Sequence, residues 1–481
     1  MRARALIAAA LLGGCTSAGP GYRPPPAAVP GRFAEAATPQ AASDAELAAW
    51  WRGFGDAQLS RLVERALAQN LDIAAAASRI REARAGERAA GAATLPRIDA
   101  EASATRQRIS EHAIPLPSGS GRTGGFGLPG SEFDTFRAGF DASWEIDLFG
   151  RTRRAVEAAA TRTAAAEWSQ RDAQVTIAAE VAAAYLRLRT DQARLATASA
   201  ERDRQQRLER LIAAQVRGGL ATGQQLAAQV SARSAAAAAL PPLEAQARTE
   251  IHALGLLTGA TTEALAAELA APAPIPQPPA IPAGLPSDLL RRRPDIRAAE
   301  RQLAAATADI GVAAADLYPR LSLTALPALV STALASLIEW GSRSYSVGAA
   351  LDWPLFDGGR RRATVDARTA AQEQAQIRYR QAVLGALRDV EDALNRVAAD
   401  RQRIAERQEA VSAAARAEQL AGTRFRGGLV TFADLLGARA GRLAAEDQLI
   451  RGRGALARDT VALAKALGGG WPELAQAGAT R

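Results

Sequence analysis

Two motifs of this chain recur at one constant offset, and this constrains the fold more than any other feature. The stretch WEIDLFGR, which begins at Trp144, returns as WPLFDGGR from Trp353, and 353 − 144 = 209. The same offset relates two short glycine motifs, Arg217-Gly218-Gly219-Leu220 and Arg426-Gly427-Gly428-Leu429. A bias toward alanine does not explain two separate motifs in one register, so we expect an internal duplication.

Upstream of these motifs the offset is larger. Asp72 matches Asp295, and 295 − 72 = 223, so the first copy carries 14 extra residues (223 − 209). The surplus falls in 114–130, where Gly, Ser and Pro predict a loop. The Pro-rich stretch 271–286 predicts a semi-rigid linker between the copies.

Each copy has the same predicted order of elements: short helix, strand, loop, strand, long helix, glycine turn and return helix. The expected divisions are a leader (1–14), an N-terminal anchored and equatorial segment (15–60), a first repeat (61–270), the linker (271–286), a second repeat (287–467) and a C-terminal tail (468–481). In the first repeat we expect strands near 97–108 and 134–148, a long helix over 151–216 and a return helix over 222–258. In the second we expect strands near 320–330 and 344–356, a long helix over 360–425 and a return helix over 431–467.

The clearest strand covers residues 134–147. Phe136, Phe140 and Trp144 alternate with polar residues such as Asp141 and Glu145. The apolar alternation returns at Tyr345, Val347, Ala349, Leu351, Trp353 and Leu355. Such a strand fits either a sheet on a soluble core or a transmembrane barrel with a polar lumen.

The two expected long helices are almost free of helix breakers. Between Arg151 and Arg217 there is no Gly or Pro, and about 66 residues at 1.5 Å each give roughly 100 Å of helix. Hydrophobic residues make up 48% of the chain but aromatic residues only 5%, and much of the apolar fraction is alanine. This composition favours long, closely paired helices over one thick core.

The net charge of the chain does not identify a partner. Its formal net charge is +9, which would suit a nucleic-acid-binding protein. The arginines are interleaved with Asp and Glu along the helical stretches, however, and a solvated helix surface explains that pattern better. We therefore expect no nucleic-acid partner.

The N-terminus has the features of an export signal. Arg2 and Arg4 precede an apolar run, which ends in Leu12-Gly13-Gly14-Cys15. This ending resembles the bacterial lipoprotein cleavage box, which implies a diacylglycerol and an N-acyl chain on Cys15. A buried cysteine in a secreted protein is the alternative; Thr16 after the cysteine favours the outer membrane.

The terminal lipid anchor favours the transmembrane interpretation of the strands. No later stretch has the roughly 18 uninterrupted apolar residues of a membrane-spanning helix, so strands would have to make any crossing. Four strands in one chain would leave two open edges, which lipid does not tolerate. Sister chains must then close the sheet, and three or four copies satisfy this requirement.

Several longer motifs resemble the outer membrane factor family of TolC- and OprM-like channels, in particular its NodT-like lipoprotein branch. They are Trp50-Trp51 with Phe54, Asp56 and Leu59, Asn70 to Ala85 with Leu95-Pro96, Gly284 to Ile296, Trp353 to Arg360, and Gly468 to Trp471. The resemblance implies a mainly α fold with transmembrane β: a homotrimeric barrel of twelve strands, four from each chain, continued by an α-helical periplasmic barrel.

The resemblance also implies a function and partners. The chain would be the outer-membrane channel of a tripartite efflux system, a passive conduit for small molecules and drugs in a Gram-negative bacterium. Its partners would be a periplasmic adaptor and an inner-membrane pump of the resistance-nodulation-division class. The alternatives are a type I protein-secretion duct with the same architecture and a lipid-anchored coiled-coil scaffold with no pore.

The resemblance places candidate site residues at the two glycine turns. Residues Arg217, Gly218, Gly219 and Leu220, and likewise Arg426, Gly427, Gly428 and Leu429, would form tips that dock the adaptor, besides ending their helices. Gln225 and Asp434 would lie at an aperture. Asp434 equally fits a solvated helix start, and Gly437 replaces a further acidic residue of the family pattern.

No catalytic group or metal site is expected. His112 and His252, the only histidines, lie far apart in the sequence, and a site needs convergent partners. The glycine-rich stretch 121–130 lacks the Lys-Ser/Thr of a phosphate loop. We therefore expect neither enzymatic activity nor a cofactor other than the lipid on Cys15.

Overall fold

The computed structural model describes residues 17–26, 29–36, 42–110 and 132–471. The chain divides into two compact units. The first is formed by residues 1–24, 81–164 and 301–377, and the second by residues 25–80, 165–300 and 378–481. The expected loop at 114–130 lies outside the described residues.

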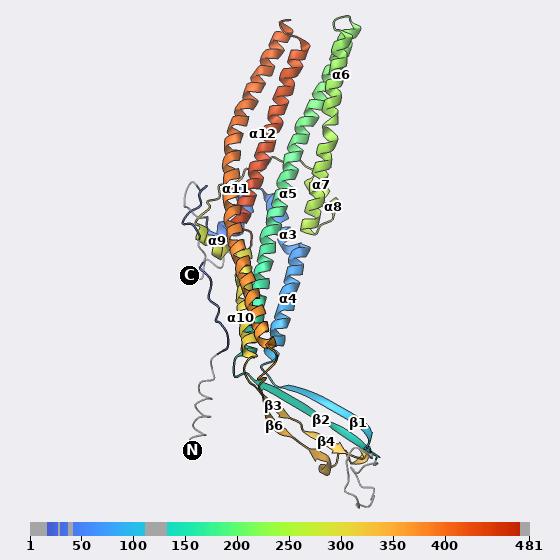
Figure 1. Cartoon of the computed structure of the whole chain (residues 1–481). Helices are drawn as coiled ribbons and strands as arrows, with labels where there is room; N and C mark the ends of the chain where they lie inside the picture. The colour runs from blue at the N-terminus through green and yellow to red at the C-terminus, as the bar shows by residue number, and fades with distance from the viewer. Residues whose placement is uncertain (1–16, 27–28, 37–41, 111–131, 472–481) are drawn as a thin grey trace, which may run out of the picture. The chain divides into compact units, whose positions relative to one another are not determined.

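The first unit contains an antiparallel sheet (Figure 1). Its strands are β1 (Arg97–Arg108), β2 (Glu132–Ile146), β3 (Arg320–Ala325), β4 (Ala328–Ser331), β5 (Arg343–Ser344) and β6 (Val347–Asp352). β3 and β4 both pair with β2, while β6 pairs with β3 and β5 with β4. The six segments thus form four rows in the order β1, β2, β3/β4 and β6/β5, and β1 and β6/β5 are the outer rows.

The third row is interrupted at Leu326 and Pro327, where one strand near 320–330 was expected. Proline has no N–H to donate to a strand ladder. The backbone of β2 follows the interruption closely, because the Phe140 N–H donates to the Pro327 carbonyl over 2.9 Å. A Cβ on Gly139 would lie 2.6 Å from that carbonyl oxygen, so glycine permits the approach. The last row ends at Asp352, short of the expected residue 356 and just before Pro354.

The two faces of the sheet differ in polarity over residues 97–104 of β1, residues 136–146 of β2, β3 and β6. At the β4/β5 end, Ser331 and Arg343 lie on the face of Phe136 and Ala138, and Val330 lies on the face of Arg137. Residues directly opposite one another in an antiparallel pair point to the same face. The pairing therefore collects these residues on one apolar face: Ile98, Ala100, Ala102, Ala104, Phe136, Ala138, Phe140, Ala142, Trp144, Ile146, Leu321, Leu323, Ala325, Val347, Ala349 and Leu351. The opposite face carries Arg97, Asp99, Glu101, Arg137, Asp141, Ser143, Glu145, Ser322, Thr324 and Asp352.

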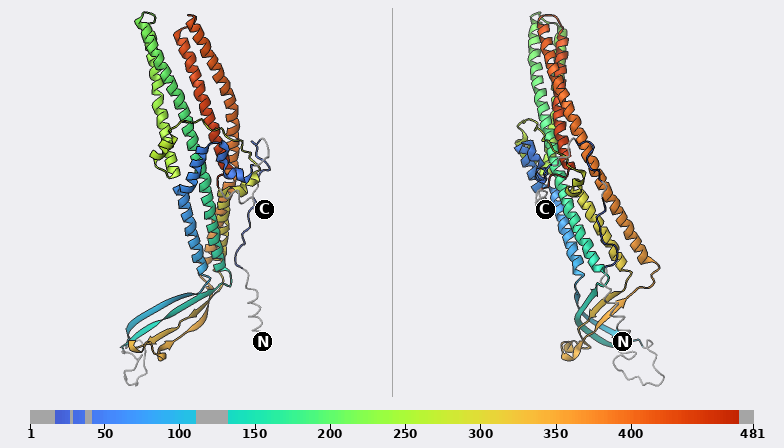
Figure 2. Two further views of the ribbon diagram at one scale, coloured as in Figure 1. Left: turned by 180° about the vertical axis from the view of Figure 1, so that it is seen from behind. Right: turned by 90° about the vertical axis from the view of Figure 1, so that its left-hand side faces the viewer.

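The second unit is helical. The long helices α5 (Arg151–Arg217) and α11 (Arg360–Arg426) contribute their C-terminal parts to it. Helix α5 turns back into α6 (Gly223–Ala238) and α7 (Leu240–Thr258), and α11 turns back into α12 (Phe432–Ala466). Figure 2 shows the two resulting pairs side by side. We refer to them as the first and the second hairpin.

Shorter helices surround the hairpins: α2 (Asp44–Ala48), α3 (Ala57–Gln69), α8 (Thr262–Leu269) and α9 (Pro286–Arg292), besides α4 (Leu71–Ala92) and α10 (Pro294–Ala315), which both units share. The core lies where α3 and α8 meet the first hairpin, and Leu62, Leu186, Leu254 and Leu265 are fully buried there. The Tyr185 hydroxyl donates to Asp56 Oδ2 over 2.8 Å, so the one polar atom of this side chain is satisfied.

The returning arm of the first hairpin is not the single helix expected over 222–258. Helix α6 ends at Ala238 and α7 begins at Leu240. Pro241 and Pro242 explain the break, because proline is tolerated in the first turn of a helix but not in its interior. The second hairpin has no proline between Phe432 and Ala466, and α12 is continuous.

Candidate functional site

The two glycine turns have matching backbone geometry. In the first hairpin the Gly219 and Leu220 N–H groups donate to Val216 and Gln215 over 3.0 and 2.8 Å. In the second, Gly428 and Leu429 donate to Phe425 and Arg424 over 3.0 and 2.9 Å. These bonds satisfy carbonyls that a helix end would otherwise leave without partners.

A glycine takes the left-handed conformation in each turn. Gly219 has φ +73° and Gly428 has φ +71°, values at which a Cβ is strained. The next residue in each turn is an exposed leucine: 82% of the surface of Leu220 and 77% of that of Leu429 is accessible. Each hairpin therefore presents one apolar side chain at its end, flanked by the exposed Arg217 or Arg426.

Gln225 and Asp434, the expected aperture residues, take the same position at the starts of α6 and α12. Gln225 Oε1 accepts from the Thr222 N–H over 2.9 Å, and the Gln225 N–H donates to Thr222 Oγ1 over 3.2 Å. Asp434 Oδ2 accepts from the Thr431 N–H over 2.8 Å, and the return bond measures 3.2 Å. Both are capping boxes, so the helix-start interpretation of Asp434 holds.

Asp434 differs from Gln225 in charge. Hydrogen bonds from the Thr431 hydroxyl and backbone lower the pKa of the exposed Asp434. The carboxylate is therefore ionised at neutral pH, whereas the amide of Gln225 is not titratable.

Ion pairs tie the two arms of each hairpin together behind its turn. Glu209 and Arg233 lie 2.8 Å apart in the first hairpin. In the second, Glu418 accepts from Arg439 Nε over 2.9 Å and also contacts Arg442. Burial would raise the pKa of Glu418, but the hydrogen bonds from Arg442 and Arg439 outweigh it and hold that pKa below its ordinary value.

The sequence reasoning missed these pairs, although a signal was present. Glu418 and Arg442 follow Glu209 and Arg233 by 209 residues each (418 − 209 = 209 and 442 − 233 = 209). Applying the offset to charged residues, and not only to the glycine motifs, would have found them. Arg439 extends the second pair into a network.

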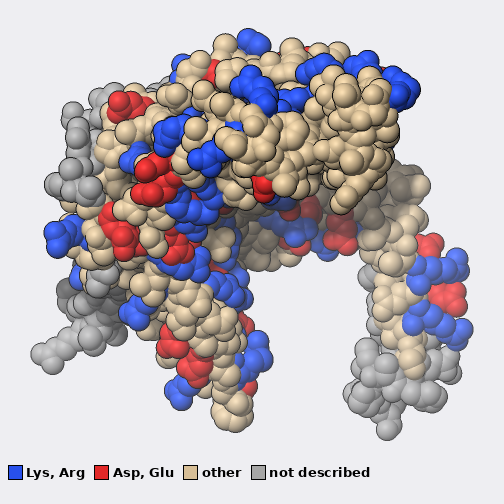
Figure 3. Space-filling view, turned by 90° about the horizontal axis from the view of Figure 1, so that it is seen from above, with Lys and Arg blue, Asp and Glu red and all other residues tan. Residues whose placement is uncertain are grey.

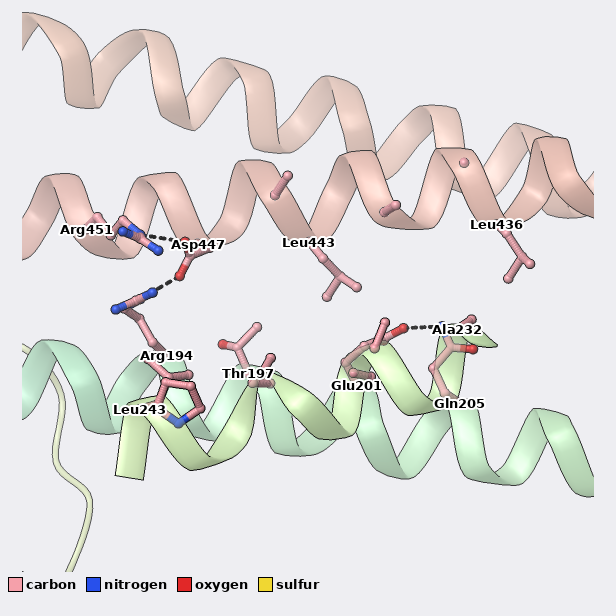
Figure 4. A pocket seen from close by; sticks show the side chains of 18 of the residues that line it. Arg194, Thr197, Glu201, Gln205, Ala232, Leu243, Leu436, Leu443, Asp447 and Arg451 are labelled. Carbon is pink, nitrogen blue, oxygen red and sulfur yellow. Dashed lines mark hydrogen bonds and ion pairs between the residues drawn. The ribbon is translucent and has the colours of Figure 1, made fainter. Parts of the chain in front are cut away.

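A groove of about 760 Å³ runs between the hairpins in the second unit (Figure 4). Its walls come from α5, α6 and α7 on one side and α12 on the other, and small residues such as Ala198, Ala235 and Ala440 line it. Asp447 of α12 spans the groove to Arg194 Nε over 2.7 Å. Alanine walls leave open the space that larger side chains would fill.

The chain just after Cys15 lies against the sheet's unit, although Cys15 itself is outside the described residues. The Ala18 N–H donates to the Phe149 carbonyl over 2.9 Å, and a Cβ on Gly150 would lie 2.6 Å from Ser17 Oγ. Phe149 and Gly150 separate β2 from α5. The start of the described chain is thereby held at the base of the sheet.

Neither a metal site nor a membrane-spanning helix is found among the residues described. No group of three or more His, Cys, Asp or Glu side chains there could hold a metal ion. His252 is exposed, and His112 lies outside the described residues. None of the described helices combines the length and apolar character of a membrane span. On the face in Figure 3, acidic side chains lie among the basic ones over much of the surface.

Comparison with known proteins decides the family. A family model described as outer membrane efflux protein matches residues 62–260 and 285–469. The chain belongs to the outer membrane efflux protein family. The resemblance to the outer membrane factors is therefore confirmed.

Relatives of this efflux protein match it along nearly their whole length. It is 34% identical over 473 residues to the pyoverdine export outer membrane protein OpmQ of Pseudomonas aeruginosa, covering 98% of this chain and 97% of the relative. It is 31% identical over 475 residues to nodulation protein T of Rhizobium leguminosarum, covering 98% and 94%. The solved outer-membrane channel OprN superposes with a TM-score of 0.86 at 33% identity, covering 95% and 100%.

These matches establish the function at the level the relatives share. The protein is the outer-membrane channel component of a multicomponent efflux system in a Gram-negative bacterium. Its family consists of transport proteins. The match to nodulation protein T also confirms the expected kinship with the NodT-like proteins.

Proposed function

We propose that three copies of the chain close their sheets into one twelve-stranded barrel, which a periplasmic barrel of helices continues. The observation that carries this proposal is the polarity of the sheet. One face is apolar over β3, β6 and residues 97–104 and 136–146 of β1 and β2, yet its side chains are exposed in a single chain, with Phe140 at 56%, Val347 at 76% and Leu351 at 64%. Lipid on that face and water on the other would satisfy both faces.

The outer rows of the sheet require further copies. Within the described sheet, β1 and β6/β5 each pair on one side only, and unpaired backbone groups are expensive in hydrocarbon. Pairing β1 of one protomer with β6/β5 of the next removes every edge. Two copies would give eight strands, whose interior the side chains fill, whereas three leave a channel. The family resemblance favours three over four.

Lipid on Cys15 would anchor the unit that contains the sheet. Ser17 and Ala18 are held at the base of the sheet, so an acylated Cys15, two residues before Ser17, lies within reach of the membrane surface that the barrel crosses. Burial of the acyl chains at about 0.8 kcal/mol per CH₂ supplies the anchoring free energy. This geometry supports a lipoprotein.

The exposed turns at 217–220 and 426–429 would dock the periplasmic adaptor, and an inner-membrane pump of the resistance-nodulation-division class would supply the energy. Leu220 and Leu429 offer apolar contacts and the neighbouring arginines offer charge. Gln225 and Asp434, a few residues beyond the turns, would line the aperture. The cargo would be small molecules, as the names of the pyoverdine exporter OpmQ and the toluene efflux protein TtgF say of those relatives.

Cysteine cross-linking across the outer rows tests the assembly. With Cys15 replaced by Ser, single cysteines placed at Ala100, Ala102 or Ala104 of β1 are combined with one at Val347 or Ala349 of β6. At least one combination should yield covalent trimers on oxidation in membranes. Chains that stay monomeric in every combination, or that form tetramers, would contradict the proposal.

An internal pair provides the matched control. Ala142 and Ala325 face each other directly in β2 and β3. Cysteines at these two positions should cross-link within one chain and leave its mass unchanged. Oxidation conditions that form this disulfide are sufficient to form one between the outer rows of adjacent protomers.

A further inference from the structure

Each hairpin of the second unit carries a similar group of four charged residues. The first charged group consists of Arg187, Asp191, Arg194 and Glu250, and the second consists of Arg396, Asp400, Arg403 and Asp459. Every member of the second group follows its counterpart by 209 residues, as in 400 − 191 = 209. Each group joins the outgoing helix of its hairpin to the return helix.

In the first charged group two arginines contact two acids. Arg187 Nε donates to Glu250 Oε1 over 2.8 Å, from α5 to α7. Arg194 Nη1 lies 3.4 Å from Asp191 Oδ1, one turn away on α5. Arg194 also donates to Asp447 of α12, so its charge is shared between two carboxylates.

The second charged group has the matching contacts, with more exposed arginines. Arg396 Nε lies 3.5 Å from Asp459 Oδ1, from α11 to α12. Arg403 Nη1 lies 3.2 Å from Asp400 Oδ1, one turn away on α11. Both arginine side chains reach toward solvent, with exposures of 51% and 61%, whereas Asp400 is only 6% exposed. The buried carboxylate is therefore poorly neutralised.

One carboxylate oxygen in each group is buried without a hydrogen-bond partner in the described structure. These atoms are Glu250 Oε2 and Asp400 Oδ2. A buried charged oxygen without a donor is costly. In the second group, Asp459 contacts Arg396, one turn before Asp400 on α11, and is an acid that could supply a proton.

The electrostatics of the other acid in each group agree with this arrangement. Burial raises the pKa of Asp459, and the neighbouring Asp400 raises it further, while Arg396 and Arg458 lower it. Burial also raises the pKa of Asp191, with Glu250 adding to the rise and Arg194 and Arg458 opposing it.

We propose that Asp400 and Asp459 form a proton-binding site that ties α11 to α12, with the proton on Asp459 donated to Asp400 Oδ2. Asp191 and Glu250 are its weaker counterpart in the first hairpin. This site goes beyond the channel function and does not depend on the number of copies in the assembly. The proton converts a repulsive pair of carboxylates into a hydrogen bond.

The sign of the pH dependence follows from the raised pKa. Between the ordinary aspartate value of 3.8 and the raised value, the folded hairpin binds a proton that the unfolded chain does not. Stability from this site is therefore fully present at low pH and is lost as the pH rises through the raised value. Low pH therefore stabilises the second hairpin, and high pH destabilises it.

Infrared difference spectroscopy of the full-length protein in detergent tests the site. We expect the carbonyl stretching band of a neutral carboxylic acid to persist above the ordinary aspartate range. Burial also raises the pKa of Asp172 and Asp191, so Asp459→Asn should weaken this band without abolishing it, and Asp400→Asn should weaken it or shift part of its titration to lower pH. Asp459→Asn should also raise the unfolding temperature near pH 8, with an effect that shrinks as the pH falls toward the ordinary aspartate value of 3.8.

A control in the same helix separates this site from general acid effects. Burial would raise the pKa of Asp447, but hydrogen bonds from Arg194 and Arg451 hold it below its ordinary value, so Asp447→Asn should leave the band intact. A band that keeps its full intensity and its titration in both Asp400→Asn and Asp459→Asn, or the absence of any such band in the unaltered protein, overturns the proposal. A band removed only by Asp191→Asn would place the proton in the first hairpin and overturn it equally.

Discussion

The two hairpins share a backbone plan and differ in the charges placed on it. Both long helices begin and end at positions 209 residues apart, and both turns place a left-handed glycine before an exposed leucine. The first hairpin has the neutral Gln225, one ion pair behind its turn and a break before Pro241. The second has Asp434, a three-residue network around Glu418 and a continuous return helix.

This difference suggests a division of labour. A neutral start to the return helix and a break near its middle give the first hairpin few charge-dependent contacts at its end. The second combines ionised carboxylates with arginines that span its arms. We therefore expect the end of the second hairpin to respond more strongly than that of the first to charge, salt and pH.

The largest expected contrast lies in the ion pairs behind the turns. Glu418→Gln removes charge from hydrogen bonds to two largely buried arginines, which should cost about 2 kcal/mol of local stability. Glu209→Gln affects one more exposed pair and should cost less than about 1 kcal/mol. Hydrogen exchange of the two hairpin ends measures both. Equal losses of local stability at the two ends would show that the ion pairs do not distinguish the hairpins.

Substitution of the turn glycines should instead affect both hairpins alike. Alanine at Gly219 or Gly428 must adopt a left-handed conformation, at a cost of about 1 kcal/mol. The same exchange measurement should show equal fraying at the two ends. Gly437→Ala, within α12 and with no neighbour in reach of its Cβ, is the control and should stabilise its helix slightly. Unequal fraying would show that the turns are not equivalent.

Removing the charge at the start of the second return helix should affect conduction more than stability. Asp434 is exposed, and three copies at an aperture would attract cations and repel one another. We expect Asp434→Ala to raise ion conductance in planar bilayers. Gln225→Ala, at the matching position, should change it less. Unchanged conductance in Asp434→Ala would exclude this residue from the gate.

A smaller contrast should appear on acidification. The pKa values of Glu418 and Asp434 lie below 4.5 and 3.8, respectively. Stability from these groups is present above those ordinary values and is lost as the pH falls through the lowered ones. The end of the second hairpin should therefore fray in acid before that of the first. Exchange rates that change in parallel at both ends would contradict this.

The periodicity of apolar residues and the positions of Gly and Pro in the sequence predicted much of this architecture. The absence of Gly and Pro between Arg151 and Arg217 predicted a helix that the structure places over those residues. The alternation around Phe140 predicted a strand with two unlike faces, and the register extends those faces over four rows. Such patterns are local, so they can be interpreted without knowledge of the tertiary contacts.

The contacts between helices could not be predicted. Alanine-rich helices show no clear apolar seam, so the sequence does not reveal which face of α11 meets α12. The burial of Asp400 and the convergence of Arg439 and Arg442 on Glu418 depend on that choice. The interruption at Pro327 likewise depends on which residue of β2 lies opposite it.

The central claim is that the polar face of the sheet lines a water-filled channel while the apolar face meets lipid. Single cysteines at the adjacent positions Ser143 and Ala142, on the polar and apolar faces, test it most directly in a chain with Cys15 replaced. In bilayers, a charged membrane-impermeant thiol reagent should change the single-channel conductance of Ser143→Cys and leave that of Ala142→Cys unaltered. Equal responses at the two positions, or no conductance even with Asp434→Ala added, would contradict the account.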